Sequence, residues 1–130
     1  MTRPELARHF EGLGLGAEDA ERRAALLDHV ATRFVALVGA PPEARWFVPG
    51  RIEVFGKHTD YAGGRSLLAA APRGFAVVMR PRPDAVVRVL DARDQQVGMV
   101  TLDRPAPSPR GWQNYVTVVA RRLAAVEVRL

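Results

Sequence analysis

A change in residue pattern near Arg45 constrains the fold of this chain more than any other feature. Before it, apolar residues recur every three or four positions, which is typical of amphipathic helices. After it, short runs of β-branched and aromatic residues alternate with glycine and proline, the pattern of strands and turns. Helices followed by strands and by one more helix predict an α+β domain.

Two helices are predicted before residue 45. Thr2 and Glu5 have the spacing of a capping box at the start of a short first helix, and the glycine-rich stretch after it should end that helix. A longer second helix should end at Gly39. Its polar face carries His29, which is therefore predicted to be exposed to solvent and not to act as a ligand.

The middle of the chain predicts a mostly antiparallel meander, with turns at Asp84-Ala85 and from Ala92 to Gln96. Apolar residues at positions 112, 115, 119, 123 and 126 repeat at helical spacing, so a last helix is expected to begin near Trp112. This helix shows no stop signal before Leu130, which predicts that the chain is part of a longer fold. The predicted strands cover residues 45–48, 52–56, 66–71, 75–80, 86–91 and 97–102.

Length and composition restrict the class of protein. The 130 residues, 48% of them hydrophobic, suit a single domain, with a helical leader over residues 1–44 and a lobe over 45–130. The net charge of +5 suits an anionic partner, but the arginines are scattered, which favours a solvated surface over a nucleic-acid site. The absence of cysteine excludes disulfides and thiolate metal sites. With no apolar leader or membrane-length stretch, a cytoplasmic protein without a membrane partner is expected.

One glycine-rich stretch imitates a nucleotide site. Gly12 to Ala17 matches the pattern G-x-G-x-x-A, which binds dinucleotides only when a strand leads into the glycines. A helix is predicted in that place, so the stretch is interpreted as a turn between helices. The phosphate-binding pattern G-x-x-x-x-G-K-[ST] is absent from the sequence.

The segment from Pro49 to Gly64 is the most informative part of the chain. It gathers a cation, an imidazole, a carboxylate and a phenol around four glycines, between two apolar strands. Glycines allow a backbone to approach a ligand closely, and a carboxylate among polar donors can hold sugar hydroxyls. The residues alone also fit a tight turn, with Asp60 as a turn acceptor and His58 as a packed polar residue.

Two motifs resemble those of the galactokinases, within the GHMP kinase family. The first combines Pro49-Gly50-Arg51, Gly56, His58-Thr59-Asp60-Tyr61 and Gly63-Gly64, and the second is Trp112-Gln113-Asn114-Tyr115-Val116. The resemblance implies the N-terminal lobe of a two-lobed kinase, a lobe similar to domain 2 of a ribosomal protein. Such a kinase transfers the γ-phosphate of ATP, with Mg²⁺, to the anomeric hydroxyl of galactose or a related hexose.

The resemblance also implies roles for single residues. Arg51 would be catalytic and stand beside the anomeric oxygen. Trp112 and Tyr115 would line the adenine pocket, whereas their helical spacing alone favours the apolar face of the last helix. No residue is assigned to a metal. The sugar-binding positions would be Lys57, His58, Asp60, Tyr61 and Gly63.

Several positions depart from the family pattern. Lys57 stands where galactokinases usually have a glutamate, Ala62 replaces an asparagine, and Leu68 replaces a proline. An ammonium group only donates hydrogen bonds and attracts negative charge, so Lys57 would suit a hexose with a carboxylate, such as a uronic acid. Alternatively, Lys57 points to solvent or pairs with a carboxylate elsewhere in the protein.

Part of the expected catalytic apparatus is missing from the sequence. Nothing in it resembles the Gly-Leu-Ser-Ser-Ser phosphate loop, and the aspartate base that the family pairs with Arg51 would lie beyond Leu130. Phosphoryl transfer depends on such a loop and a metal, so the 130 residues alone are expected to be inactive. The alternatives are a non-catalytic sugar-binding or sensor module and, by fold analogy only, a basic RNA-associated domain.

Overall fold

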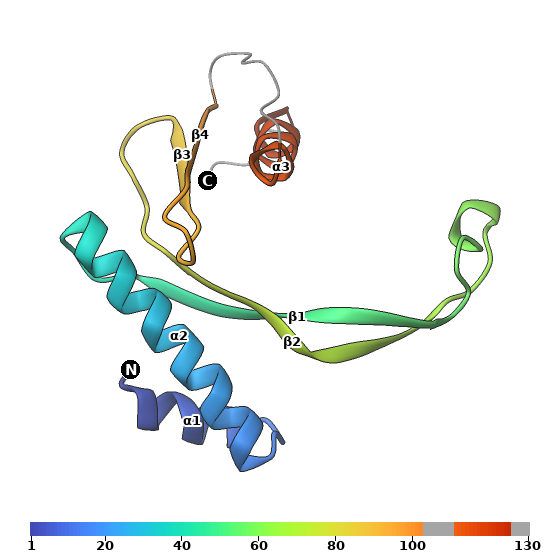
Figure 1. Cartoon of the computed structure of the whole chain (residues 1–130). Coiled ribbons are helices and arrows are strands. Elements are labelled where there is room, and N and C mark those ends of the chain that lie inside the picture. Colours follow the sequence, from blue (N-terminus) through green and yellow to red (C-terminus); the bar gives the residue numbers. More distant parts are fainter. Residues whose placement is uncertain (103–110, 126–130) are drawn as a thin grey trace. The chain divides into compact units, whose positions relative to one another are not determined.

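The computed structural model describes residues 1–102 and 111–125, with the side chain of Asp60 excepted. Helices come first, antiparallel strands follow and a helix comes last, so the predicted α+β class is confirmed (Figure 1). The chain divides into two compact units, Met1–Arg80 and Pro81–Leu130. The helical leader thus forms one unit with the first strands, and the boundary does not fall at residue 45. None of the described helices is long and apolar enough to cross a membrane.

The two helices of the first unit are α1 (Arg3–Gly12) and α2 (Ala17–Val38). The predicted capping box is present, and the backbone N–H of Thr2 donates to Oε2 of Glu5 at 2.7 Å. This bond lowers the pKa of the Glu5 carboxyl. Gly39 ends α2 as predicted, in the left-handed conformation at φ 74° that favours glycine. His29 is exposed, also as predicted.

The first unit continues with a long antiparallel hairpin of β1 (Ala44–Phe55) and β2 (Leu67–Met79). Four of the predicted strands are therefore two long ones. The glycines and prolines that suggested chain breaks lie at a register shift between Pro49 and Arg51. A Cβ at Gly74 would lie 2.7 Å from Cα of Pro49, so the strands pass too closely there for a side chain.

The helices cover one face of the hairpin at its base. The ring of Phe47 on β1 meets Phe10 of α1 edge-on, with centroids 6.4 Å apart, and the guanidinium of Arg23 lies 4.4 Å above it. Beyond this base the hairpin runs past α2 without cover in its unit, and the side chain of Phe55 is 71% exposed (Figure 1). The buried core consists of Leu6, Phe10, Ala20, Ala24 and Leu27.

The second unit contains a short hairpin and a helix. Strand β3 (Val86–Leu90) pairs antiparallel with β4 (Val97–Thr101), and the turn predicted from Ala92 to Gln96 joins them. Helix α3 (Gln113–Ala125) contacts β4. The predicted helix is confirmed from Gln113 to Ala125, and its last predicted apolar position, 126, lies outside the described residues.

The predicted single meander is wrong, because the described strands form two separate two-stranded sheets. Asp84-Ala85 precedes β3 and is not a turn between paired strands. The reason lies in the segment between β2 and β3, where Pro81 and Pro83 have no N–H to donate to a sheet. Arg82, between the two prolines, pairs with Asp84 through bonds of 2.8 and 2.6 Å.

Candidate functional site

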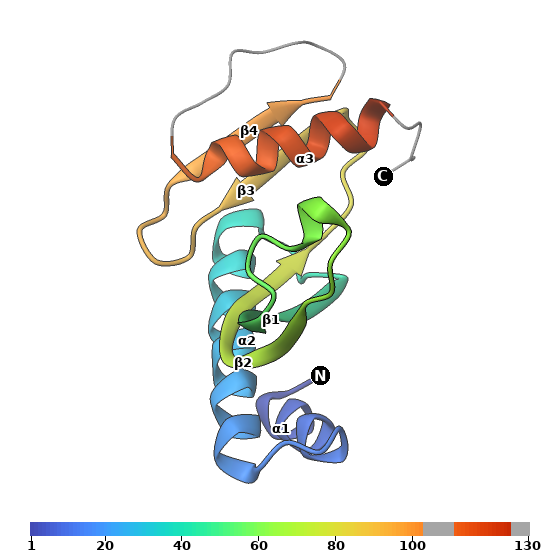
Figure 2. The same ribbon diagram turned by 90° about the vertical axis from the view of Figure 1, so that its right-hand side faces the viewer.

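The candidate site is the loop that joins β1 to β2, from Gly56 to Ser66. It contains a single turn of 3₁₀ helix, η1 (Asp60–Ala62), which both views show at the far end of the hairpin (Figures 1 and 2). The predicted setting, a loop between two strands without a continuous helix, is confirmed. Pro49-Gly50-Arg51 lies on β1, so the strand delivers Arg51 toward the loop.

Thr59 closes this loop through its side chain and its backbone. Its hydroxyl donates to the Gly56 carbonyl at 2.6 Å, and the Arg65 carbonyl lies 3.3 Å from the same oxygen. Its own carbonyl accepts the N–H of Gly64 at 2.8 Å and that of Ala62 at 3.1 Å. Residues from both ends of the loop therefore meet at Thr59, a role that the sequence analysis did not assign.

Two glycines permit this closure. Gly56 has φ 96°, and a Cβ there would lie 2.6 Å from the Arg65 carbonyl oxygen and 2.8 Å from Cα of Ser66. A Cβ at Gly64 would lie 2.8 Å from Cβ of Thr59. All three contacts are shorter than Cβ atoms tolerate, so side chains at these positions would open the loop. The predicted sugar-binding Gly63, at φ 73°, has open space around it.

His58 and Tyr61 are the predicted site residues that the structure brings together. Their rings are stacked, with centroids 5.8 Å apart and planes 18° from parallel. His58 has φ 64°, an uncommon conformation for a residue with a side chain, and such strain is often found at functional sites. Tyr61 is 82% exposed, so the stacked pair presents a polar aromatic surface to solvent.

The cations of the site are free to meet a ligand. Arg51 and Lys57 are exposed, and the side chain of neither forms a hydrogen bond or ion pair with another residue in the described ranges. The backbone of Asp60 begins η1, while its side chain lies outside the described part of the chain. The Lys57 ammonium, next to His58 in the chain, can donate hydrogen bonds to a ligand rich in hydroxyls, and its positive charge also suits a negative group.

Trp112 and Tyr115 belong to the second unit. A Cβ at Gly98 would lie 3.2 Å from Cη2 of Trp112, so the indole packs on β4, and its buried N–H has no acceptor among residues 1–102 and 111–125. Tyr115 is 77% exposed and lines an apolar groove of about 400 Å³ with Val87 and Leu123. Trp112 thus occupies a packing position, and the adenine-pocket role of both residues stays a prediction.

Comparisons with known proteins agree with this geometry. The family model described as the galactokinase galactose-binding signature matches residues 32–81, which include β1, the loop and β2. A galactokinase of Roseiflexus sp. (strain RS-1) is 36% identical over 94 residues, 71% of this chain and 24% of that protein. One from Chloroflexus aggregans is 33% identical over 105 residues, 80% of this chain and 27% of that protein. One from Lactiplantibacillus plantarum is 35% identical over 99 residues, 74% and 26% of the two chains.

The site and these matches define the class of protein. The chain carries a galactose-binding signature on a strand–loop–strand unit, and it is similar in sequence to galactokinases. The chain is similar to galactokinases over most of its length, so the resemblance drawn from the two motifs is confirmed. The chain spans about a quarter of the length of the curated relatives that it matches. No solved structure matches it significantly.

Proposed function

We propose that this chain is the sugar-binding N-terminal part of an enzyme that transfers the γ-phosphate of ATP to the anomeric hydroxyl of galactose or a related hexose. The observation that carries the proposal is that the matched signature coincides with the Thr59-closed loop. A cytoplasmic location, where ATP is available, is part of the proposal.

In this proposal each predicted residue of the site has a role. His58, Asp60 and Tyr61 bind sugar hydroxyls, since an imidazole, a carboxylate and a phenol together offer donors and acceptors. Arg51 lies beside the anomeric oxygen, where its fixed positive charge stabilises the charge that develops during transfer. Lys57 faces the part of the sugar that distinguishes one hexose from another.

ATP and Mg²⁺ would be held largely by other parts of the enzyme. The 130-residue sequence contains no glycine-rich phosphate loop, and the described residues contain no group of three potential metal ligands. These residues do not fit a metal site by themselves. The chain alone is proposed to bind sugar without transferring phosphate.

A second candidate function is a sugar-binding or sensor module without catalysis. It is favoured by one specific observation, namely that the matching family model describes galactose binding and not phosphate transfer. The two candidates agree on the ligand and differ on turnover.

The decisive experiment measures galactose binding by calorimetry and galactose-dependent ADP release, with the protein expressed from its complete reading frame. Binding with turnover is expected, and Arg51→Ala should abolish turnover while binding remains. Binding without turnover would favour the sensor. If galactose and related hexoses neither bind nor are phosphorylated, both candidates are wrong.

The 130-residue chain provides a separate check. It should release no ADP in the presence of galactose and ATP, because the phosphate loop is absent from it. Sugar-dependent turnover by this chain would show that the phosphate site has been misplaced.

A further inference from the structure

We infer that Thr59 is the positioning residue of the sugar site, whose hydroxyl fixes the loop conformation in which His58 faces a sugar. The inference rests on the proposed function, because it assigns to Thr59 a role in sugar affinity. Thr59 itself would not donate a hydrogen bond to the sugar. Its hydroxyl has one hydrogen, and the 2.6 Å contact with the Gly56 carbonyl engages it.

The contacts of Thr59 connect the two ends of the loop. The hydroxyl reaches Gly56 at the end of β1 and lies 3.3 Å from the Arg65 carbonyl before β2. The Thr59 carbonyl accepts the N–H of Gly64 at 2.8 Å. Because Thr59 is β-branched, its side chain has few rotamers, and the hydroxyl is held in this direction without a supporting core.

The neighbours of Thr59 show why this closure matters for a ligand. His58 precedes it with φ 64°, a conformation that costs free energy and persists only where the surrounding contacts enforce it. Tyr61, two residues later, stacks on the His58 ring. Thr59 lies between the two stacked residues, so the turn that its hydroxyl closes is also the turn that brings their rings together.

Because Thr59 lies far from the buried core, its effect on the loop can be measured separately from its effect on the stability of the protein. The residue is exposed, and the buried core of the first unit lies at the opposite end of the hairpin, on α1 and α2. Loss of the hydroxyl should therefore loosen the loop locally and leave the unfolding transition of the protein nearly unchanged. A residue with a purely structural role would show the reverse pattern.

Two substitutions at Thr59 and one control test the inference. Thr59→Val keeps the shape and removes the donor, whereas Thr59→Ser keeps the donor and removes the methyl group. Ser66→Ala serves as the control, because the Ser66 hydroxyl also reaches the Gly56 carbonyl but at 3.5 Å. Each variant is prepared in the protein expressed from its complete reading frame, and folding is checked by circular dichroism.

Calorimetry with galactose should show a dissociation constant roughly tenfold higher for Thr59→Val, the effect of one lost hydrogen bond. Thr59→Ser and Ser66→Ala should remain within about threefold of the wild type. The KM for ATP should not change in any variant. The NMR signals of the His58 ring should shift in Thr59→Val alone, because the stack with Tyr61 loosens.

Three results would overturn the inference. Thr59→Val could bind galactose as tightly as the wild type, Thr59→Ser could be as weak as Thr59→Val, or the His58 signals could stay unchanged in Thr59→Val. A wild-type protein that binds no hexose overturns the proposed function instead, and the His58 signals then still report whether the hydroxyl holds the loop.

Discussion

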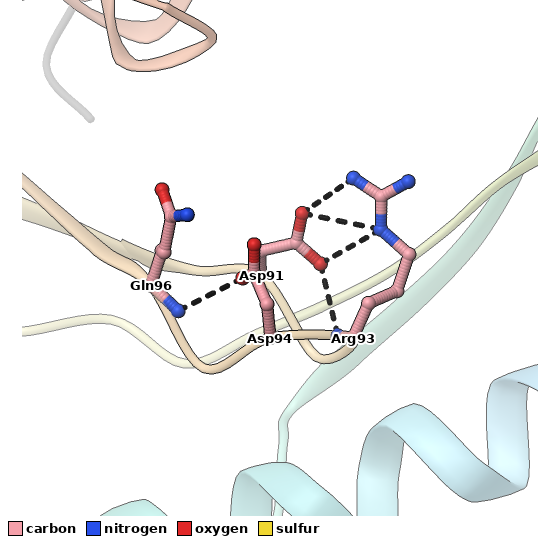
Figure 3. A network of polar contacts seen from close by, with 4 residues as sticks. All are labelled: Asp91, Arg93, Asp94 and Gln96. Atoms are coloured by element: carbon pink, nitrogen blue, oxygen red, sulfur yellow. Dashed lines mark hydrogen bonds and ion pairs between the residues drawn. The ribbon is translucent and has the colours of Figure 1, made fainter.

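The connections of the two hairpins both contain a residue in an unfavourable backbone conformation, but different side chains hold the chain around it. Each connection contains one residue other than glycine with a left-handed backbone, His58 at φ 64° between β1 and β2 and Gln95 at φ 63° between β3 and β4. In the second turn, carboxylates hold the chain: Asp91 accepts the N–H of Arg93 at 2.9 Å and Asp94 accepts that of Gln96 at 3.0 Å (Figure 3). The Arg93 guanidinium also donates a hydrogen bond to Oδ2 of Asp91.

The difference shows which of the two connections can serve a ligand. The β3–β4 turn uses its charged side chains to stabilise its own backbone. The β1–β2 loop is closed by the neutral hydroxyl of Thr59 and by backbone bonds, and no described residue pairs with Lys57. A strained backbone residue is therefore not sufficient evidence of a site. Free polar side chains beside it are the stronger indication.

The largest expected effect concerns Lys57, the free cation of the first loop. In the complete enzyme, Lys57→Glu should raise the ratio of kcat/KM for galactose to that for galacturonate by ten- to a hundredfold, or about 1.5–3 kcal/mol. A carboxylate accepts hydrogen bonds from a neutral sugar and repels a uronate, whereas an ammonium does the opposite.

Arg65→Glu is the matched control for Lys57, because it makes the same charge change on an exposed residue of the same loop. Its effect on the ratio should be small. If Lys57→Glu changes the ratio of the two kcat/KM values by less than about threefold, Lys57 does not discriminate between galactose and galacturonate.

The next effect tests the two left-handed residues against each other. His58→Gly should weaken galactose binding about tenfold, since a hydrogen-bonding side chain is lost, while Gln95→Gly should leave binding unchanged. Calorimetry on the complete protein measures both. If both variants bind galactose equally well, the β1–β2 connection is not distinguished from the β3–β4 connection as a sugar site.

A smaller effect concerns the pH dependence of the β3–β4 turn. The hydrogen bond from the Arg93 side chain, then that from its backbone N–H, lowers the pKa of Asp91 to about 2. The folded pKa is below the unfolded value, so the stabilisation is complete above about pH 5 and is lost progressively as the pH falls through about 2. Since Arg93 is 85% exposed, we expect a loss of only about 1–2 kcal/mol.

Urea unfolding between pH 5 and pH 2 measures this loss. Asp91→Asn should remove the part of the acid sensitivity that belongs to Asp91, whereas Glu53→Gln, at an exposed position of β1, should not. If wild type and Asp91→Asn lose the same free energy of unfolding over this range, the Asp91–Arg93 pair does not stabilise the turn.

The smallest effect is a gain in stability. Gln95→Gly should raise the free energy of unfolding by about 0.5–1 kcal/mol, because glycine adopts a left-handed backbone without strain, and its greater freedom in the unfolded chain offsets part of that gain. Thermal unfolding compares it with Gln96→Gly, a neighbour without positive φ, which should lose stability. A loss in Gln95→Gly would show that the turn is not strained.

The local features of the fold could be predicted because their signals are short. The capping box needs only Thr2 and Glu5, and the end of α2 needs only a glycine at position 39. The loop from Gly56 to Gly64 was also located correctly, because its glycines and polar residues lie between two strand-forming runs. Fold class and family followed from such segments, whereas the roles of Arg51, Trp112 and Tyr115 remain predictions.

The strand pairing and the closure of the site could not be predicted in this way. Proline and glycine near position 50 suggested a chain break, but in the structure they form a bulge inside β1 opposite Gly74. The role of Thr59 depends on carbonyls at both ends of the loop, up to six residues away. A sequence window records propensity and spacing, and it does not record which distant atoms come within a few ångströms of each other.

The sequence by itself determined the α+β class, the helix ends and the segment that carries the galactose-binding signature. The tertiary structure decided that the strands form two separate hairpins, and that a hydroxyl closes one connection while carboxylates close the other. The physical reason is that caps and turns depend on neighbours along the chain. Sheet pairing and loop closure depend instead on steric fit and on hydrogen bonds between residues that only folding brings together.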